Sequence, residues 1–282
     1  MDAAQARRIL RQHLETDRLL GVETLPSPRV APSAPPKPTP PPSRALSNAK
    51  SRITPQQQPQ SAPAATPAAQ PRLTPDAPVI DIPDGDKAAA LDRLRERLHD
   101  DPQQRAKCMP GTQLVFGEGD PDAQIMFIGE GAGEDEARTG RPFVGRAGQL
   151  LDNMIKAMGL DRSAVYITNC VHFRPPGNRT PTPDEVALGW PYMIGQVQIV
   201  RPKVIVALGG TSAKALLDTS TGITRLRGQW NRFDAVQPPI DLMPTFHPAF
   251  LLRSYTTDNR KKVWSDLLAV LDKLGLEAPS KS

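Results

Sequence analysis

A glycine-rich segment with several carboxylates, Gly129–Glu136 (GEGAGEDE), is the first part of the 282-residue chain that could do chemistry. Glycines allow a tight turn and let a ligand approach backbone N–H groups closely. The G-x-G-x-x-G spacing of dinucleotide-binding loops is absent, and the four acidic side chains would repel a phosphate group. The segment therefore indicates a ligand site that is not a phosphate cradle.

Three later segments combine basic, aromatic and imidazole groups. Gly140–Gly148 (GRPFVGRAG) places arginines around Phe143, which an ordinary surface loop with a core aromatic would also explain. Phe173–Pro181 (FRPPGNRTP) is a basic loop stiffened by prolines, and such a loop suits contact with nucleic acid phosphates. Thr245–Arg253 (TFHPAFLLR) places His247 after an apolar stretch, although a single histidine is more often structural than catalytic.

Apolar stretches and amphipathic helical patterns alternate through the second two thirds of the chain. We expect strands at 124–129, 164–168, 203–209 and 241–246, and helices at 88–99, 148–158, 184–200, 211–217 and 261–274. All-apolar strands that alternate with helices indicate a parallel sheet covered on both faces. We therefore predict an α/β fold, a three-layer αβα sandwich with a central four-stranded parallel sheet. Ligands of such sheets bind at the carboxyl ends of the strands.

The composition divides the chain into two parts. Half of the 32 prolines fall between Pro26 and Pro78, where no hydrophobic periodicity survives. Residues 1–78 also hold ten Lys/Arg and five Asp/Glu, so the whole net charge of +5 lies there. We predict a short amphipathic helix within 1–22, a Pro-rich disordered linker over 23–84, and a catalytic domain over 85–282. The N-terminal helix either packs nowhere or docks a protein partner.

Cysteine usage and hydropathy limit the class of protein. Cys108 and Cys170 are too few for a disulfide framework or a four-thiolate metal site. No run of 18 apolar residues is present, and the N-terminus has no apolar core of a secretory signal. We expect a cytoplasmic protein with no membrane association.

Four segments together resemble one family. They are GEGAGEDEARTGRPFVGRAGQLLDNMI, VYITNCVHFRPPGNRTP, LRGQW and TFHPAFLLR. In order and in spacing, they are similar to motifs of the iron–sulfur (family 4) uracil-DNA glycosylases. The resemblance runs from about Val115 to Leu267. It implies a DNA repair enzyme of base excision repair that hydrolyses the N-glycosidic bond of uracil. Such an enzyme flips the nucleotide out of the stack and reads the base in a pocket.

The resemblance also implies roles for individual residues. Asn169 takes the position of the amide that reads uracil N3–H and O4, and Phe143 that of the stacking aromatic. Glu136 matches the acidic residue near C5, where a thymine methyl would clash. His247 matches the histidine that stabilises negative charge on O2, and Glu130 is the best candidate to position or polarise the attacking water.

Further residues complete the implied site. Gly131 and Asn178 belong to the implied uracil pocket. Leu251 and Leu252 resemble the wedge that fills the vacated stack. The implied DNA-binding residues are Arg174, Arg179, Leu251, Leu252 and Arg253.

The chain also departs from the family pattern. Ala132 stands where the family has proline, and Ala137 stands where an acidic residue follows the family's second Glu. Only Cys108 is found where the family has Cys-x-x-Cys, Phe173 replaces a third cluster cysteine, and Trp190 stands near the fourth position. We therefore predict no cofactor and no iron–sulfur cluster, with Phe173 and Trp190 filling its volume.

Two alternatives stay open on the sequence. The first is a catalytically inactive DNA-binding relative, for which Ala132 and the missing cluster argue. The second is a glycosylase with shifted base preference, for hypoxanthine or xanthine. For the main hypothesis we expect a monomer whose partner is uracil-containing DNA.

Overall fold

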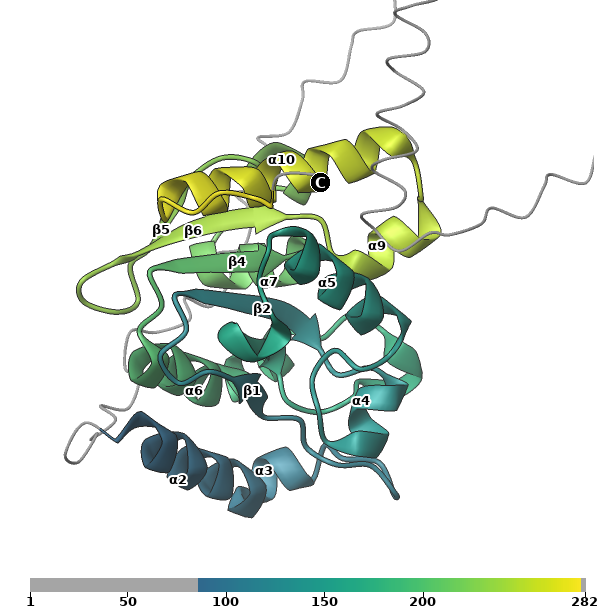
Figure 1. The fold of residues 1–282 in the computed structure, drawn as a ribbon. Helices are drawn as coiled ribbons and strands as arrows, with labels where there is room; N and C mark the ends of the chain where they lie inside the picture. Colours follow the sequence, from purple (N-terminus) through teal and green to yellow (C-terminus); the bar gives the residue numbers. More distant parts are fainter. Residues whose placement is uncertain (1–85, 280–282) are drawn as a thin grey trace, which may run out of the picture. The chain divides into compact units, whose positions relative to one another are not determined.

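The computed structural model describes residues 86–279 (Figure 1). The amphipathic helix predicted within 1–22 and the linker predicted over 23–84 lie outside the described residues. Among the described residues, no helix is long and apolar enough to cross a membrane.

A six-stranded sheet with the order β1-β3-β2-β4-β6-β5 forms the centre of the described domain. Its four inner strands are parallel: β2 (Ile125–Gly131), β3 (Tyr166–Val171), β4 (Val204–Leu208) and β6 (Ile240–Thr245). The predicted four-stranded parallel sheet is therefore confirmed. Each edge carries a short antiparallel strand that was not predicted, β1 (Gly117–Gly119) and β5 (Asn231–Phe233). Three residues are too few to show a strand's period-two pattern.

The five predicted helices are all present, with ends shifted by a few residues. They are α2 (Lys87–Asp100), α5 (Arg146–Ala157), α6 (Pro183–Val200), α7 (Gly210–Leu217) and α10 (Thr257–Lys273). The remaining elements are one to two turns long: α3 (Pro102–Arg105), α4 (Glu134–Thr139), η2 (Arg162–Ala164), η3 (Pro176–Asn178), α8 (Ile223–Leu226) and α9 (Pro248–Arg253).

Alternate residues of the inner strands enter two different hydrophobic cores. In β2, Ile125 and Phe127 pack with residues of α5, α9 and α10, whereas Met126 and Ile128 pack with residues of α2, α6 and α7. This alternation follows from the opposite directions of successive side chains in a strand. Because both faces are covered by helices (Figure 1), the fold is a three-layer αβα sandwich.

The core on the α6 side contains the two aromatics predicted to replace cluster cysteines. Phe173 is 1% exposed and Trp190 is 7% exposed, and both belong to the same apolar cluster as Cys170. Cys108 packs against this cluster from its edge. The region is therefore packed by apolar groups.

Truncation of Phe173 is expected to be costly. Phe173→Ala should lower the free energy of unfolding by about 3–5 kcal/mol, because it removes a fully buried ring and leaves a cavity. The measurement is denaturant unfolding, with Trp230→Ala as control, since that ring is 38% exposed. The control should cost about 1 kcal/mol at most. A loss below about 1 kcal/mol for Phe173→Ala would show that this volume collapses or is not part of the core.

Candidate active site

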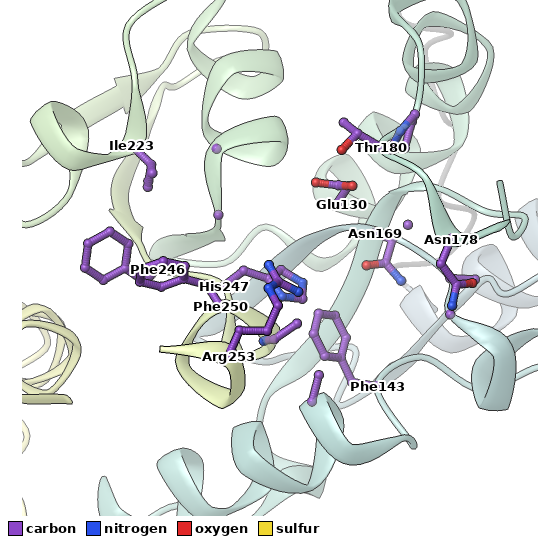
Figure 2. A pocket seen from close by; sticks show the side chains of 18 of the residues that line it. Glu130, Phe143, Asn169, Asn178, Thr180, Ile223, Phe246, His247, Phe250 and Arg253 are labelled. Carbon is purple, nitrogen blue, oxygen red and sulfur yellow. The ribbon is translucent and has the colours of Figure 1, made fainter. Parts of the chain in front are cut away.

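A pocket of about 720 Å³ opens at the carboxyl ends of the parallel strands. Each inner strand contributes to its wall: Glu130 in β2, Asn169 in β3, Gly209 after β4 and His247 after β6. In the sheet order, β3 and β4 lie on opposite sides of β2, so the chain reverses its winding direction at β2. Doubly wound sheets bind ligands at such a switch point. Figure 2 shows Glu130, Asn169 and His247 around this space.

Asn169 presents a buried amide to the pocket. The side chain is 1% exposed, and neither Oδ1 nor Nδ2 has a hydrogen-bond partner within residues 86–279. An unpaired buried amide costs free energy of folding, so such groups in native proteins form hydrogen bonds to water or to a ligand. One donor and one acceptor side by side can recognise a ligand edge that offers the complementary acceptor and donor.

The Phe143 ring forms another wall, next to Asn169. The ring is 5% exposed and lines the pocket. A Cβ atom at Gly129 would collide with both Asn169 Oδ1 and the far edge of the Phe143 ring. Only glycine at this point of β2 lets the amide and the aromatic ring approach each other. A planar ligand that meets the Asn169 amide can therefore stack on Phe143.

His247 also lines the pocket, and its ring centroid lies 5.7 Å from that of Phe143. It is the N-cap of α9, and its Nδ1 accepts the backbone N–H of Ala249 at 3.1 Å. Burial, together with the positive charge of Arg253, lowers the pKa of His247 to about 4. Because Nδ1 is an acceptor and the ring is neutral, the proton must lie on Nε2. His247 therefore offers one N–H donor, as a neutral group at the pocket.

Glu130 carries a carboxylate at the tip of β2. Its Oε2 accepts a hydrogen bond of 2.6 Å from Thr211 Oγ1, at the start of α7. Both residues lie where β2 and β4 end, and Glu130 lines the pocket. A carboxylate that is oriented by a hydroxyl group can accept a hydrogen bond from a water molecule. This bond orients the lone pair of the water oxygen. Thr211 was not predicted, although the turn Gly209-Gly210-Thr211 after an apolar strand was a usable signal.

Glu136 lines the pocket and also holds part of its wall in place. It lies in α4, lines the pocket and is 9% exposed. Its Oε1 accepts hydrogen bonds of 2.9 Å from the backbone N–H groups of both Val144 and Gly145. The carboxylate therefore anchors the loop that carries Phe143, a function that the family resemblance did not suggest.

The proline-stiffened loop places Asn178 and Arg179 at the pocket, but not Arg174. Arg174 donates to Asn178 Oδ1 at 2.6 Å and pairs with Glu134 at 2.9 Å, so it braces the loop. Arg179 makes two hydrogen bonds of 2.7 Å to Glu185, at the start of α6. The hydrogen bonds from Arg179 are the main reason that the pKa of Glu185 falls to about 2.

The two leucines after His247 differ from each other. Leu251 is 1% exposed and belongs to the core between the sheet and α5. The helix α9 turns this side chain inward because it follows His247 by one helical turn. Leu252 is partly buried, and Arg253 is exposed and lines the pocket.

Nine of the twelve predicted site residues thus line one pocket. The three that do not are Arg174, Leu251 and Leu252. Residues that line the pocket and were not predicted include Ile223, Thr224, Phe246, Phe250, Asn259 and Lys262. Four of these six lie in α8 and α10, and only the packing of these helices beside the carboxyl ends of the strands brings them to the pocket.

The residues do not fit a four-iron cluster. Such a cluster requires about four thiolates, and the chain has two cysteines. Burial raises the pKa of Cys170 to about 12 and also raises the pKa of Cys108. Within residues 86–279, no three His, Cys, Asp or Glu side chains are grouped so that they could hold a metal ion.

The fold and the pocket define a doubly wound α/β protein with a pocket at its switch point that suits a small planar ligand. Comparisons with known proteins agree with this class and narrow it. A family model described as the uracil DNA glycosylase superfamily matches residues 116–268. The chain therefore belongs to the uracil-DNA glycosylase superfamily.

Individual relatives place the chain within the type-4 branch. The type-4 uracil-DNA glycosylase of Thermotoga maritima is 45% identical over 163 residues, which cover 55% of this chain and 80% of that protein. The type-4 enzyme of Archaeoglobus fulgidus is 37% identical over 173 residues, 60% of this chain and 86% of that protein. A type-5 enzyme of Pyrobaculum aerophilum is 34% identical over 116 residues, 35% of this chain and 50% of that protein.

The protonation state of His247 can be tested directly. Because its pKa is lowered to about 4, the imidazole should stay neutral, with the proton on Nε2, from about pH 8 down to about pH 5. Nitrogen-15 NMR of the histidine rings measures both properties, and His247→Asn assigns the signal. A His247 signal that titrates near pH 6.5 would contradict the neutral donor.

Proposed function

We propose that this protein hydrolyses the N-glycosidic bond of uracil in DNA. The single observation that carries the proposal is the buried Asn169 amide, which has no partner among the described residues and faces a pocket walled by Phe143. Membership of the uracil-DNA glycosylase superfamily supports it. The proposed substrate is uracil-containing DNA, from which the target nucleotide must be flipped to enter the pocket.

Recognition of uracil follows from hydrogen-bond complementarity. Asn169 Oδ1 accepts from uracil N3–H, while its Nδ2 donates to uracil O4. Cytosine has an acceptor at N3 and a donor at C4, so the same amide is mismatched at both positions. Phe143 stacks on the base. The Asn169 side chain is buried, so the groups packed around it keep its amide in one orientation.

Bond cleavage leaves negative charge on the departing base. We assign its stabilisation to His247 Nε2–H, which a neutral imidazole offers toward uracil O2. A donor aimed at developing charge typically contributes on the order of 100- to 1,000-fold in rate. Glu130, oriented by Thr211, would position the water molecule that attacks the sugar carbon.

Several groups would hold the DNA itself. Arg253 and Arg179 are exposed at the pocket and suit contact with phosphates. Leu252 is the remaining candidate for the wedge, since Leu251 is in the core. Arg174 acts indirectly in this proposal, through the loop that carries Asn178.

Further parts of the proposal concern the whole chain. We propose that the catalytic domain spans 85–282 and acts as a monomer, and that the segment 1–22, for which the sequence predicts a helix, docks a protein partner. The free thiols of Cys108 and Cys170 suit a reducing compartment such as the cytoplasm.

Asn169→Asp is the variant that tests recognition. A carboxylate cannot donate to uracil O4, so uracil excision should fall by about 100-fold or more. The measurement is abasic-product formation on oligonucleotides that each carry a single uracil, hypoxanthine, xanthine or thymine. Asn231→Asp in β5 is the matched control and should keep parental activity.

The outcomes of this assay separate the alternatives. Parent protein that cuts no substrate but binds DNA would indicate an inactive relative. Faster release of hypoxanthine or xanthine than of uracil would indicate a shifted preference. Uracil excision by Asn169→Asp at the parental rate would remove Asn169 from the recognition site.

We also propose that the protein works without an iron–sulfur cluster. The apolar packing of Phe173 and Trp190 and the presence of only two cysteines in the chain support this. Protein purified under anaerobic conditions should be colourless, contain no stoichiometric iron, and excise uracil. Stoichiometric iron by elemental analysis would overturn the proposal.

A further inference from the structure

The backbone of Phe143 adopts an uncommon conformation. Its φ is 51°, in the left-handed region that bulky L-residues rarely adopt. A conformation of this kind persists only where surrounding contacts over-determine it. The groups that contact this part of the chain therefore control where the aromatic ring lies.

Arg162 holds the carbonyl side of this turn. It is the first residue of η2 and does not line the pocket. Its Nη1 donates to Phe143 O at 3.2 Å, and its Nη2 donates to Pro142 O. One guanidinium group thus binds the carbonyl oxygens on both sides of the Phe143 Cα atom.

The opposite side of the turn is held by Glu136 and α5. Glu136 accepts the backbone N–H groups that follow Phe143. Any Cβ atom at Gly148, in the first turn of α5, would overlap the Phe143 carbonyl group, so the helix packs directly on this backbone. These contacts leave the turn little freedom to relax while Arg162 is in place.

Carboxylates fix the position of Arg162. Its Nε and Nη2 bond Glu118 Oε1 at 3.0 and 2.8 Å, and its Nη1 bonds Asp152 at 2.6 Å. Arg141 binds the same Glu118 carboxylate at 2.8 and 3.0 Å, but from the solvent side. Burial alone would raise the pKa of Glu118, but the hydrogen bonds from Arg141 and Arg162 lower it. The carboxylate therefore stays charged and keeps Arg162 oriented.

We propose that Arg162 is a positioning residue for uracil excision and acts through Phe143. By binding two carbonyl groups, it holds the strained turn so that the ring faces Asn169 and His247 in the pocket. The inference rests on the proposed function, since it requires that Phe143 stacks on the base. Arg162 itself touches neither the base nor the reacting atoms in this proposal.

A double-mutant cycle tests this pathway. Arg162→Gln should lower single-turnover uracil excision by about 10- to 100-fold, because a misplaced stacking surface displaces the base. In a Phe143→Ala background the same change should cost less than about threefold, because the ring through which it acts is absent. Such non-additivity is not expected if Arg162 only supports the general fold.

Two further variants guard against a loss of folding. Arg162→Lys keeps the charge near Glu118 and Asp152 but cannot reproduce the planar fork, so its activity should lie between parent and Arg162→Gln. Arg141→Gln is the matched control, because it removes a guanidinium from the same carboxylate without touching the turn. It should excise uracil within about threefold of the parent. Unfolding midpoints of all variants are measured in parallel.

The outcomes distinguish this inference from the proposed function. Equal loss from Arg162→Gln in the parent and Phe143→Ala backgrounds would overturn the positioning role while leaving the uracil activity in place. Equal effects of Arg141→Gln and Arg162→Gln would overturn it as well. A parent protein that excises no uracil would overturn the proposed function itself.

Discussion

Parallel pairing among the four inner strands is the constraint on which the site depends. Gly129 of β2 is in register with Asn169 of β3, and on the other side Leu208 of β4 is in register with Thr245 of β6. Each pair lies within two residues of a pocket group, so the register places those groups at one edge. A shift by one residue would turn every side chain of a strand to the other face. The two apolar cores, which demand opposite faces for alternate residues, prevent that shift.

The same edge must hold polar groups that the core excludes. Asn169 is buried without a partner among residues 86–279, and His247 is kept neutral by burial. Both conditions oppose folding, because unpaired or desolvated polar groups lose their water. They are tolerated since the surrounding strands and helices pack tightly on both faces. The result is a set of donors and acceptors already oriented before a ligand arrives, which is the condition for electrostatic stabilisation of developing charge.

Ionic groups around the wall of the pocket support this arrangement. Arg162, which Glu118 orients, and Glu136 bond the backbone of the turn at Phe143 from two different elements. On the α6 side, apolar packing around Phe173 supports the loop that carries Asn178. In the family pattern this second support includes metal ligands, and here its residues are aromatic and apolar. Both supports hold loops rather than contact a ligand, so they can change in chemistry while the pocket residues stay the same.

The order of strands and helices and the identity of the main pocket groups were predictable from the sequence. Apolar strands and helix faces have local periods, and a residue near the end of a parallel strand or just after it lies at the carboxyl edge, as Asn169 and His247 do. Their individual roles came from the family resemblance and stay proposals.

Only the tertiary structure decided the partners of individual side chains. The inward direction of Leu251, the use of Glu136 as a backbone anchor, and the contacts of Thr211 and Arg162 all involve residues from other elements. Such contacts depend on how helices pack against the sheet, and the hydrophobic periodicity of a single segment does not predict that packing. Local sequence therefore determined which groups reach the edge of the sheet, while long-range packing determined which of them face the pocket and which hold it in place.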